Sequence, residues 1–164
     1  TAEACTAMDR AVELHAEHMG EHHPMTLIIT RERARLLVLV GRTDEALAAL
    51  ETVAADLAAA LGEAHIERLD TLFSLAGLLG TQGLADQSAP LIDEIADHLA
   101  SSPAQDPVRE ATLRLQLIQR WRACGQAARA KEFAERSLAL LRERLPGDAE
   151  IIRQLESSAL SPLD

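Results

Sequence analysis

The chain has 164 residues, a formal net charge of −10, 48% apolar residues and only 2% aromatic residues, while 30 residues are alanine. Strands of sandwiches and barrels need β-branched and aromatic side chains, so this composition favours an all-α domain whose helices pack closely through alanine. The excess of acidic residues disfavours nucleic acid and anionic membranes as partners. No apolar run reaches the 18 or so residues that a bilayer span requires. Cys5 and Cys124 form neither a metal spacing nor a disulfide framework, which fits a reducing compartment and predicts a cytoplasmic location.

An internal repeat of 42 residues organises the chain. The segment from Gly20 to Leu27, GEHHPMTL, recurs from Gly62 to Leu69 as GEAHIERL. Three further glycines keep the same spacing: Gly41, Gly83 and Gly125. Counting back by one repeat from the apolar residues that follow Gly41 leads to Ala4, Met8 and Ala11. The chain therefore opens inside a repeat, and we expect it to be a piece of a longer protein.

Helical periodicity predicts the elements in chain order. Residues 1–19 form a half repeat with a helix at 2–18, and residues 20–61 form a repeat with helices at 25–40 and 44–60. Residues 62–103 hold helices at 66–81 and 86–100, and residues 104–145 hold helices at 107–123 and 128–144. Residues 146–164 form a C-terminal capping segment with a helix at 149–157. A turn glycine such as Gly41 adopts the left-handed conformation that ends a helix, and the short connections make neighbouring helices antiparallel.

The repeat resembles the tetratricopeptide repeat (TPR), in the 42-residue form seen in kinesin light chains and many bacterial signalling proteins. The start of that form, Gly-x-x-His-Pro-x-Thr-Leu, is matched by Gly20, His23, Pro24, Thr26 and Leu27. Its inner turn, Gly-Arg-x-Asp-Glu-Ala, is matched by Gly41, Arg42, Asp44, Glu45 and Ala46. The resemblance spans residues 4–145 and implies a right-handed α-α superhelix, a TPR-like solenoid of antiparallel helix pairs. A HEAT-like helical repeat of similar length is the alternative architecture.

In proteins of this kind, the first helix of each repeat lines a concave groove that binds a peptide. Carried over by spacing from the turn glycines, the resemblance places seven candidate residues on this face: Arg31, Arg35 and Val38, then Asp70 and Phe73, then Gln119 and Arg122. Arg31 and Arg35 are one helical turn apart, so they could bind one carboxylate together. Phe73 could form a small apolar pocket with the glycines beside it. The simpler interpretation is that the arginines pair with Glu32 and neighbouring acids on a solvated face.

Catalytic residues and cofactor motifs are not indicated. His15 and His18 lie three residues apart on one helical face, a spacing that can bind zinc. Their place near a helix C-terminus favours a contact with the helix dipole instead, and His23 recurs as His65 in the loops between repeats. Cys124 precedes a turn glycine at a helix end that disfavours a thiolate. The sequence predicts no enzyme and no cofactor, and it leaves open whether the two histidines bind a metal.

The sequence is compatible with two functions. The first is a non-catalytic scaffold that binds a protein or peptide, of which an acidic segment is one candidate, as part of a larger bacterial regulatory or signalling protein. Many alanines and arginines with a single lysine, Lys131, indicate a GC-rich genome, which is compatible with this setting. The alternative is a structural spacer or self-association element without a groove ligand. In that case the apolar face around Ala4, Met8 and Ala11 could join two copies as a homodimer.

Overall fold

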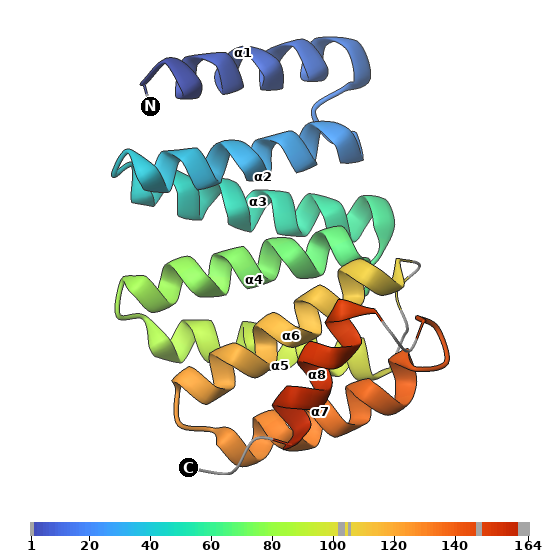
Figure 1. Ribbon diagram of the computed structural model, residues 1–164. Coiled ribbons are helices and arrows are strands. Elements are labelled where there is room, and N and C mark those ends of the chain that lie inside the picture. The colour runs from blue at the N-terminus through green and yellow to red at the C-terminus, as the bar shows by residue number, and fades with distance from the viewer. Residues whose placement is uncertain (1, 102–103, 105, 147–148, 161–164) are drawn as a thin grey trace. The chain divides into compact units, whose positions relative to one another are not determined.

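The chain is all-α. In the computed structural model, which describes residues 2–101, 104, 106–146 and 149–160, helices follow one another through short connections, and these residues contain no strand (Figure 1). The helices are α1 (Ala2–Met19), α2 (Pro24–Leu39), α3 (Thr43–Leu61), α4 (Ile66–Thr81), α5 (Ala85–Ser101), α6 (Pro107–Ala123), α7 (Ala127–Leu141) and α8 (Glu150–Leu160). They confirm the helices that the repeat predicts, with ends that differ by at most three residues. Within the described ranges, no helix is both long and apolar enough to cross a membrane.

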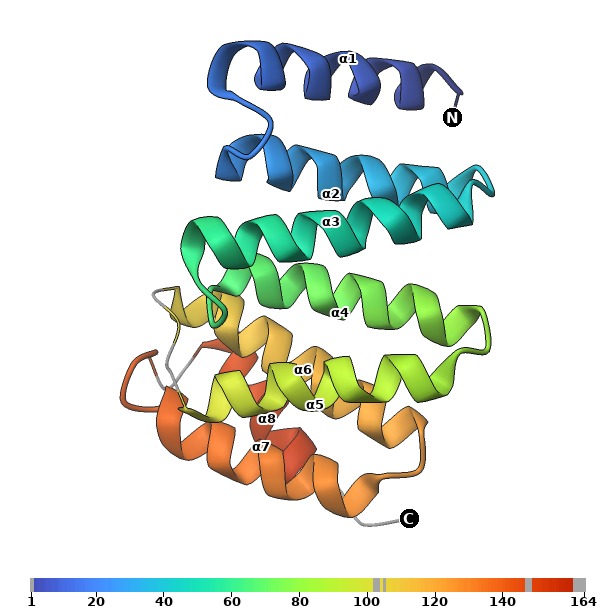
Figure 2. The same ribbon diagram turned by 180° about the vertical axis from the view of Figure 1, so that it is seen from behind.

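Two compact units make up the chain, residues 1–98 and residues 99–164. In the first unit, α2 packs against α1 and α3, and α3 packs against α4 (Figures 1 and 2). In the second unit, α7 packs against both α6 and α8. These helices therefore pack mainly against their neighbours in sequence, as a repeat architecture requires.

The inner turns of the repeats depend on glycine. Gly41 has a φ of 81°, in the left-handed region that side chains disfavour, and the equivalent Gly83 and Gly125 have φ values of 77° and 74°. After the first of these glycines, the backbone N–H of Arg42 donates to the carbonyl of Leu37 at 2.9 Å. This bond closes the last turn of α2, so the helix ends where the sequence predicts.

Histidine caps the first helix of two repeats. The Nδ1 atom of His23 accepts a hydrogen bond from the backbone N–H of Met25 at 3.2 Å, and Nδ1 of His65 accepts from that of Glu67 at the same distance. In the third repeat, Asp106 accepts from two backbone N–H groups at the start of α6. These caps confirm that His23 and His65 belong to the loops between repeats, and they explain why the motif places histidine there.

We expect His65→Ala to lower the free energy of unfolding by about 0.5–2 kcal/mol, because it leaves the Glu67 N–H without an acceptor. His65→Asp restores an acceptor, so it should lower the free energy of unfolding by less than His65→Ala does. Urea unfolding followed by circular dichroism measures both variants. His22→Ala is the control, because the exposed His22 bonds the side chain of Asp56 and caps no helix among the described residues. A loss for His65→Ala no larger than that of the control would contradict the capping role.

Small residues set the spacing of helices in the first unit. Ala34 of α2 and Ala46 of α3 are both fully buried, and Leu37 and Leu50 lie in the same cluster. Leucines of α4, including Leu79, complete this cluster. In the second unit, the buried Trp121 packs edge-to-face on Phe133 with ring centroids 5.1 Å apart, which confirms Trp121 as a core residue.

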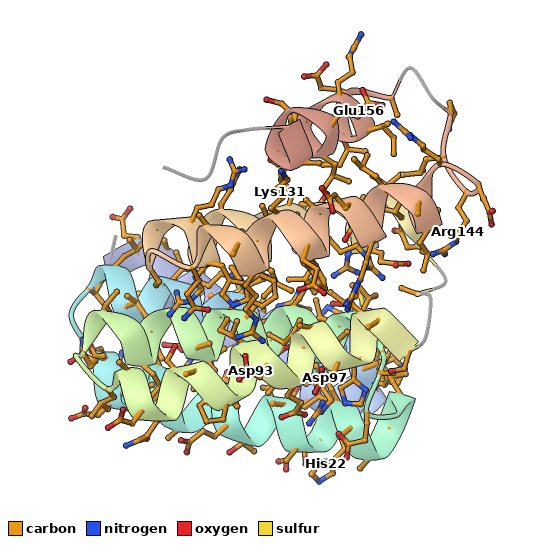
Figure 3. The ribbon with its side chains drawn as sticks, turned by 90° about the horizontal axis from the view of Figure 1, so that it is seen from below. His22, Asp93, Asp97, Lys131, Arg144 and Glu156 are labelled. Atoms are coloured by element: carbon orange, nitrogen blue, oxygen red, sulfur yellow. The ribbon has the colours of Figure 1, made fainter. Side chains whose placement is uncertain are left out.

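A buried ionic network crosses the second unit. The carboxylate of Glu110, which is 0% exposed, accepts hydrogen bonds from Arg114 Nε at 2.9 Å, from the backbone N–H of Ala104 at 2.9 Å, and from Arg144. Arg114 also donates to Ser137 Oγ at 3.2 Å and to the carbonyl of Leu99. Burial lowers the pKa of the Arg114 guanidinium, and the bond to Glu110 opposes that change. Figure 3 labels Arg144, on the turn after α7, so the network joins the start of α6 to the end of α7.

Breaking this network should destabilise the second unit. Glu110→Ala leaves two guanidinium groups without their carboxylate, and we expect it to lower the free energy of unfolding by about 3–5 kcal/mol. Urea unfolding followed by the fluorescence of Trp121, the single tryptophan of the chain, reports on this unit. Glu132→Ala removes an exposed ion pair of the same spacing, with Arg136, and should change stability by about 0.5 kcal/mol or less. Equal losses for the two variants would be evidence against the network.

Candidate functional site

The candidate site is the face that α2 and α4 share in the first unit. These two helices begin at equivalent positions of the repeat, each after a capping histidine. Contacts between their side chains place them beside each other: Arg31 of α2 reaches Glu67, and Arg35 of α2 reaches Ser74. The face therefore combines the residues predicted for the first repeat with those predicted for the second.

Arg31 lies inside this pair of helices. Its side chain is only 7% exposed, and its Nη1 atom donates to the Glu67 carboxylate at 2.9 Å and to the Glu67 carbonyl at 3.1 Å. Its Nε atom donates to Glu32 at 3.3 Å. A guanidinium held by two carboxylates and a carbonyl joins α2 to α4, and it leaves little of its surface to a ligand.

Arg35, one turn further along α2, has a different environment. Its side chain is 53% exposed, and it donates to Glu32 at 3.2 Å and to Ser74 Oγ at 3.3 Å. Exposed contacts of this length contribute little to stability, so an incoming carboxylate can replace them at small cost. The structure thus separates two arginines that the sequence treats alike, because only Arg31 has a buried acidic partner.

The two helices that Arg35 joins also carry apolar and small residues on their surface. Val38, one turn after Arg35, is 38% exposed, and the adjacent Leu39 is more exposed still. On α4, Asp70 and Phe73 are half-buried. Gly77 is helical, and a Cβ atom built on it would meet no atom within 4 Å, so the surface of α4 is open at this point. The face can receive an aliphatic or aromatic side chain next to a carboxylate.

Gln119 and Arg122 belong to the second unit. Gln119 is exposed on α6, whereas Arg122 is half-buried and donates to the carbonyl of Ser158 on α8. The C-terminal helix α8 therefore binds the guanidinium of Arg122, a residue that the sequence predicts to bind a ligand. The candidate site is defined on the first unit alone.

Of the two histidines with metal spacing, His18 has a structural contact. Nδ1 of His18 bonds the carbonyl of Leu14 at 2.7 Å, within its own helix. A different group, Glu63 with Glu94 and His98, brings three potential metal-ligand atoms within 4.8 Å of one another, the single such group among the described residues. The guanidinium of Arg68 already lies 2.7 Å from the Glu63 carboxylate and 2.6 Å from that of Glu94. A positive charge therefore stands between the two carboxylates, which disfavours a metal ion there.

One position of the repeat carries polar contacts that the sequence did not reveal. Thr26, Arg68 and Glu110 are equivalent in the 42-residue register, and each bonds the loop that precedes its helix. Thr26 donates to the carbonyl of Gly20 at 2.9 Å, Arg68 donates to that of Glu63 at 2.9 Å, and Glu110 accepts from Ala104. The signal was a polar or charged residue directly before Leu27, Leu69 and Ala111; of these polar residues, only Thr26 is part of the repeat motif matched in the sequence.

Comparison with solved structures identifies the fold. A crystal structure of the nearly identical TPR-like repeats of a Podosopora anserina "putative kinesin light chain" is 24% identical to this chain. The match covers 96% of this chain and 75% of that one, with a TM-score of 0.69. A variant of that protein matches with 24% identity, coverage of 96% and 74%, and a TM-score of 0.70. A scan of protein-family models finds no match, and neither does a search of curated proteins. The chain is an all-α helical repeat protein with the TPR-like solenoid fold.

The different burial of the two arginines predicts different effects on stability. Arg31→Ala should lower the free energy of unfolding by about 3–5 kcal/mol, because the Glu67 carboxylate loses its buried partner. Arg35→Ala should cost about 1 kcal/mol or less. Circular dichroism during urea unfolding measures both, since the chain has no tryptophan in this unit. If Arg35→Ala proved as costly as Arg31→Ala, Arg35 would be a structural residue and not a binding residue.

Proposed function

We propose that this protein is a non-catalytic scaffold whose α2–α4 face binds a segment of a partner protein that carries a carboxylate. TPR-like repeats generally mediate protein–protein interaction through the extended surfaces that stacked helices create. The observation that supports this face is the exposure of Arg35: its guanidinium is half-exposed and its present contacts are weak. Val38 follows it by one turn on α2, and Gly77 follows its contact Ser74 by one turn on α4.

In this proposal the residues have separate roles. Arg35 binds the carboxylate through charge-assisted hydrogen bonds. Val38 and Phe73 contact an apolar side chain of the same segment, and Gly77 allows the segment to approach α4 closely. Arg31 is a positioning residue, because it holds α2 and α4 at a fixed spacing through Glu67.

The proposed setting is a larger bacterial regulatory or signalling protein in the cytoplasm. The resemblance to the long repeats of such proteins supports this setting, and so does a composition with many arginines and one lysine. Such a scaffold would bring a partner to the other domains of the protein without chemistry of its own.

A capture experiment with variants tests the proposed face. Wild-type protein and Arg35→Ala are immobilised, and bound proteins from a bacterial lysate are identified by mass spectrometry over a series of salt concentrations. We expect a partner whose capture falls about tenfold or more in Arg35→Ala, since a hydrogen bond to a charged group is worth about 1.5–3 kcal/mol. Its capture should also weaken as salt rises.

Two further variants separate binding from folding. Arg153→Ala is the matched control, because Arg153 is similarly exposed and pairs with Glu150 at the same spacing as Arg35 with Glu32. Gly77→Leu places a side chain in open space within a helix, so it should preserve or raise stability while it blocks the face. A partner captured equally by all variants would place binding elsewhere. The absence of any partner on the wild-type protein would favour the alternative of a structural spacer.

A further inference from the structure

The carboxylate of Glu32 bridges the two arginines of α2. Its Oε1 atom accepts a hydrogen bond from Arg31 Nε at 3.3 Å, and its Oε2 atom accepts one from Arg35 Nη1 at 3.2 Å. The side chain of Glu32 is 38% exposed, so this carboxylate lies at the surface of the candidate site. The chain itself therefore supplies a carboxylate to Arg35, at the group that we propose for the carboxylate of a partner.

The two terminal nitrogens of Arg35 bond different helices. Nη1 donates to Glu32 on its own helix, whereas Nη2 donates to Ser74 Oγ on α4 at 3.3 Å. A ligand carboxylate that replaces Glu32 at Nη1 does not require the bond to Ser74 to break. The position that Glu32 holds on Arg35 is therefore a defined site for one carboxylate oxygen.

Glu32 keeps a partner after such a replacement. Its other oxygen stays bonded to Arg31, whose side chain is fixed in the fold by an ion pair with Glu67 at 2.9 Å. A partly exposed carboxylate that retains one guanidinium is not left buried and unpaired, so the exchange costs no more than one exposed ion pair. The geometry thus makes Glu32 a reversible occupant of Arg35 Nη1.

The acid occurs in the repeat that carries the arginine. Neither charge is present at the equivalent positions of the other two repeats, which are Ser74 and Gly77 in α4 and Gln116 and Gln119 in α6. The repeat fold therefore forms without a charge at either position. An exposed pair three residues apart on a helix contributes little to stability, so the joint presence of Glu32 and Arg35 points to a role in binding.

We propose that Glu32 is an internal competitor that sets the affinity threshold of the α2–α4 face, an inference that rests on the proposed function of this face. It weakens the binding of every carboxylate at Arg35 by the same factor, because each one must first displace Glu32 and then lie beside its charge. A simple anion such as acetate gains little from this exchange. A partner segment binds because it adds apolar contacts with Val38 and Phe73. Glu32 thereby restricts the face to acidic segments with an apolar side chain next to the carboxylate.

Chemical modification of Arg35 tests this competition without an identified partner. Wild-type protein and Glu32→Gln, which keeps an acceptor oxygen for Arg31, are treated with the arginine reagent phenylglyoxal, and modification of each arginine is followed by peptide mass spectrometry. We expect Arg35 to react about fivefold faster in Glu32→Gln, since it loses one exposed ion pair. Acetate should protect Arg35 in both proteins, with half-protection at an acetate concentration about fivefold lower in the variant.

A peptide probe tests the apolar part of the proposal. The acetylated tripeptide amide Leu-Glu-Leu replaces acetate in the same protection experiment. It should protect wild-type Arg35 at a concentration about tenfold or more below that of acetate, because its leucines contact Val38 and Phe73. Glu32→Gln should lower both half-protecting concentrations by the same factor. A peptide that protects no better than acetate would overturn the selection of apolar segments.

Glu150→Gln is the matched control, because Glu150 pairs with the similarly exposed Arg153 at the same spacing. It should speed the modification of Arg153 and leave that of Arg35 unchanged. An unchanged rate at Arg35 in Glu32→Gln would overturn the role of Glu32, while the capture experiment with Arg35→Ala would still decide the proposed function. If Arg35 reacts faster in Glu32→Gln but acetate and the peptide protect it in neither protein, Arg35 binds no carboxylate, and both proposals fail.

Discussion

Every helix in this protein depends on a neighbour to cover its apolar face. The constraint is clearest where Ala34 meets Ala46, because two fully buried alanines allow α2 and α3 to approach closely enough for Leu37 and Leu50 to pack beside them. A helix of 15–19 residues is of marginal stability in water by itself, so this contact between neighbours stabilises both. The turn glycines and the helix caps then serve one purpose, which is to bring each helix back against the one before it.

Polar contacts refine this arrangement at fixed places in the repeat. Histidine or aspartate caps the first helix, and the side chain equivalent to Thr26 bonds the preceding loop. In the second unit that position holds Glu110, whose buried carboxylate forms ion pairs with Arg114 and Arg144. The same structural need is met by a neutral hydroxyl in one repeat and by an ionic network in another. Such substitutions vary the chemistry of a repeat while they preserve its geometry.

The proposed binding surface is a departure from the repeat. Arg35 is exposed on α2 where the equivalent residue of α4 is Gly77, so the two helices carry a charge and a glycine at the same position of the repeat. A glycine inside a helix lowers helix propensity, and this cost is the physical reason to look for function at this place.

The sequence alone determined the fold and most of its details. The 42-residue repeat, the bounds of α2 to α6 within one residue and the left-handed glycines followed from helical periodicity and backbone preference, which act locally. The seven candidate residues followed from the register, but their environments did not. Arg31 and Arg35 have the same side chain, one turn apart, and only Glu67, 36 residues away, makes one buried and leaves the other half-exposed. Likewise, Arg122 bonds the carbonyl of Ser158 because α8 packs beside α6. Tertiary structure settles which charges are buried and paired, because pairing depends on contacts between residues far apart in the chain.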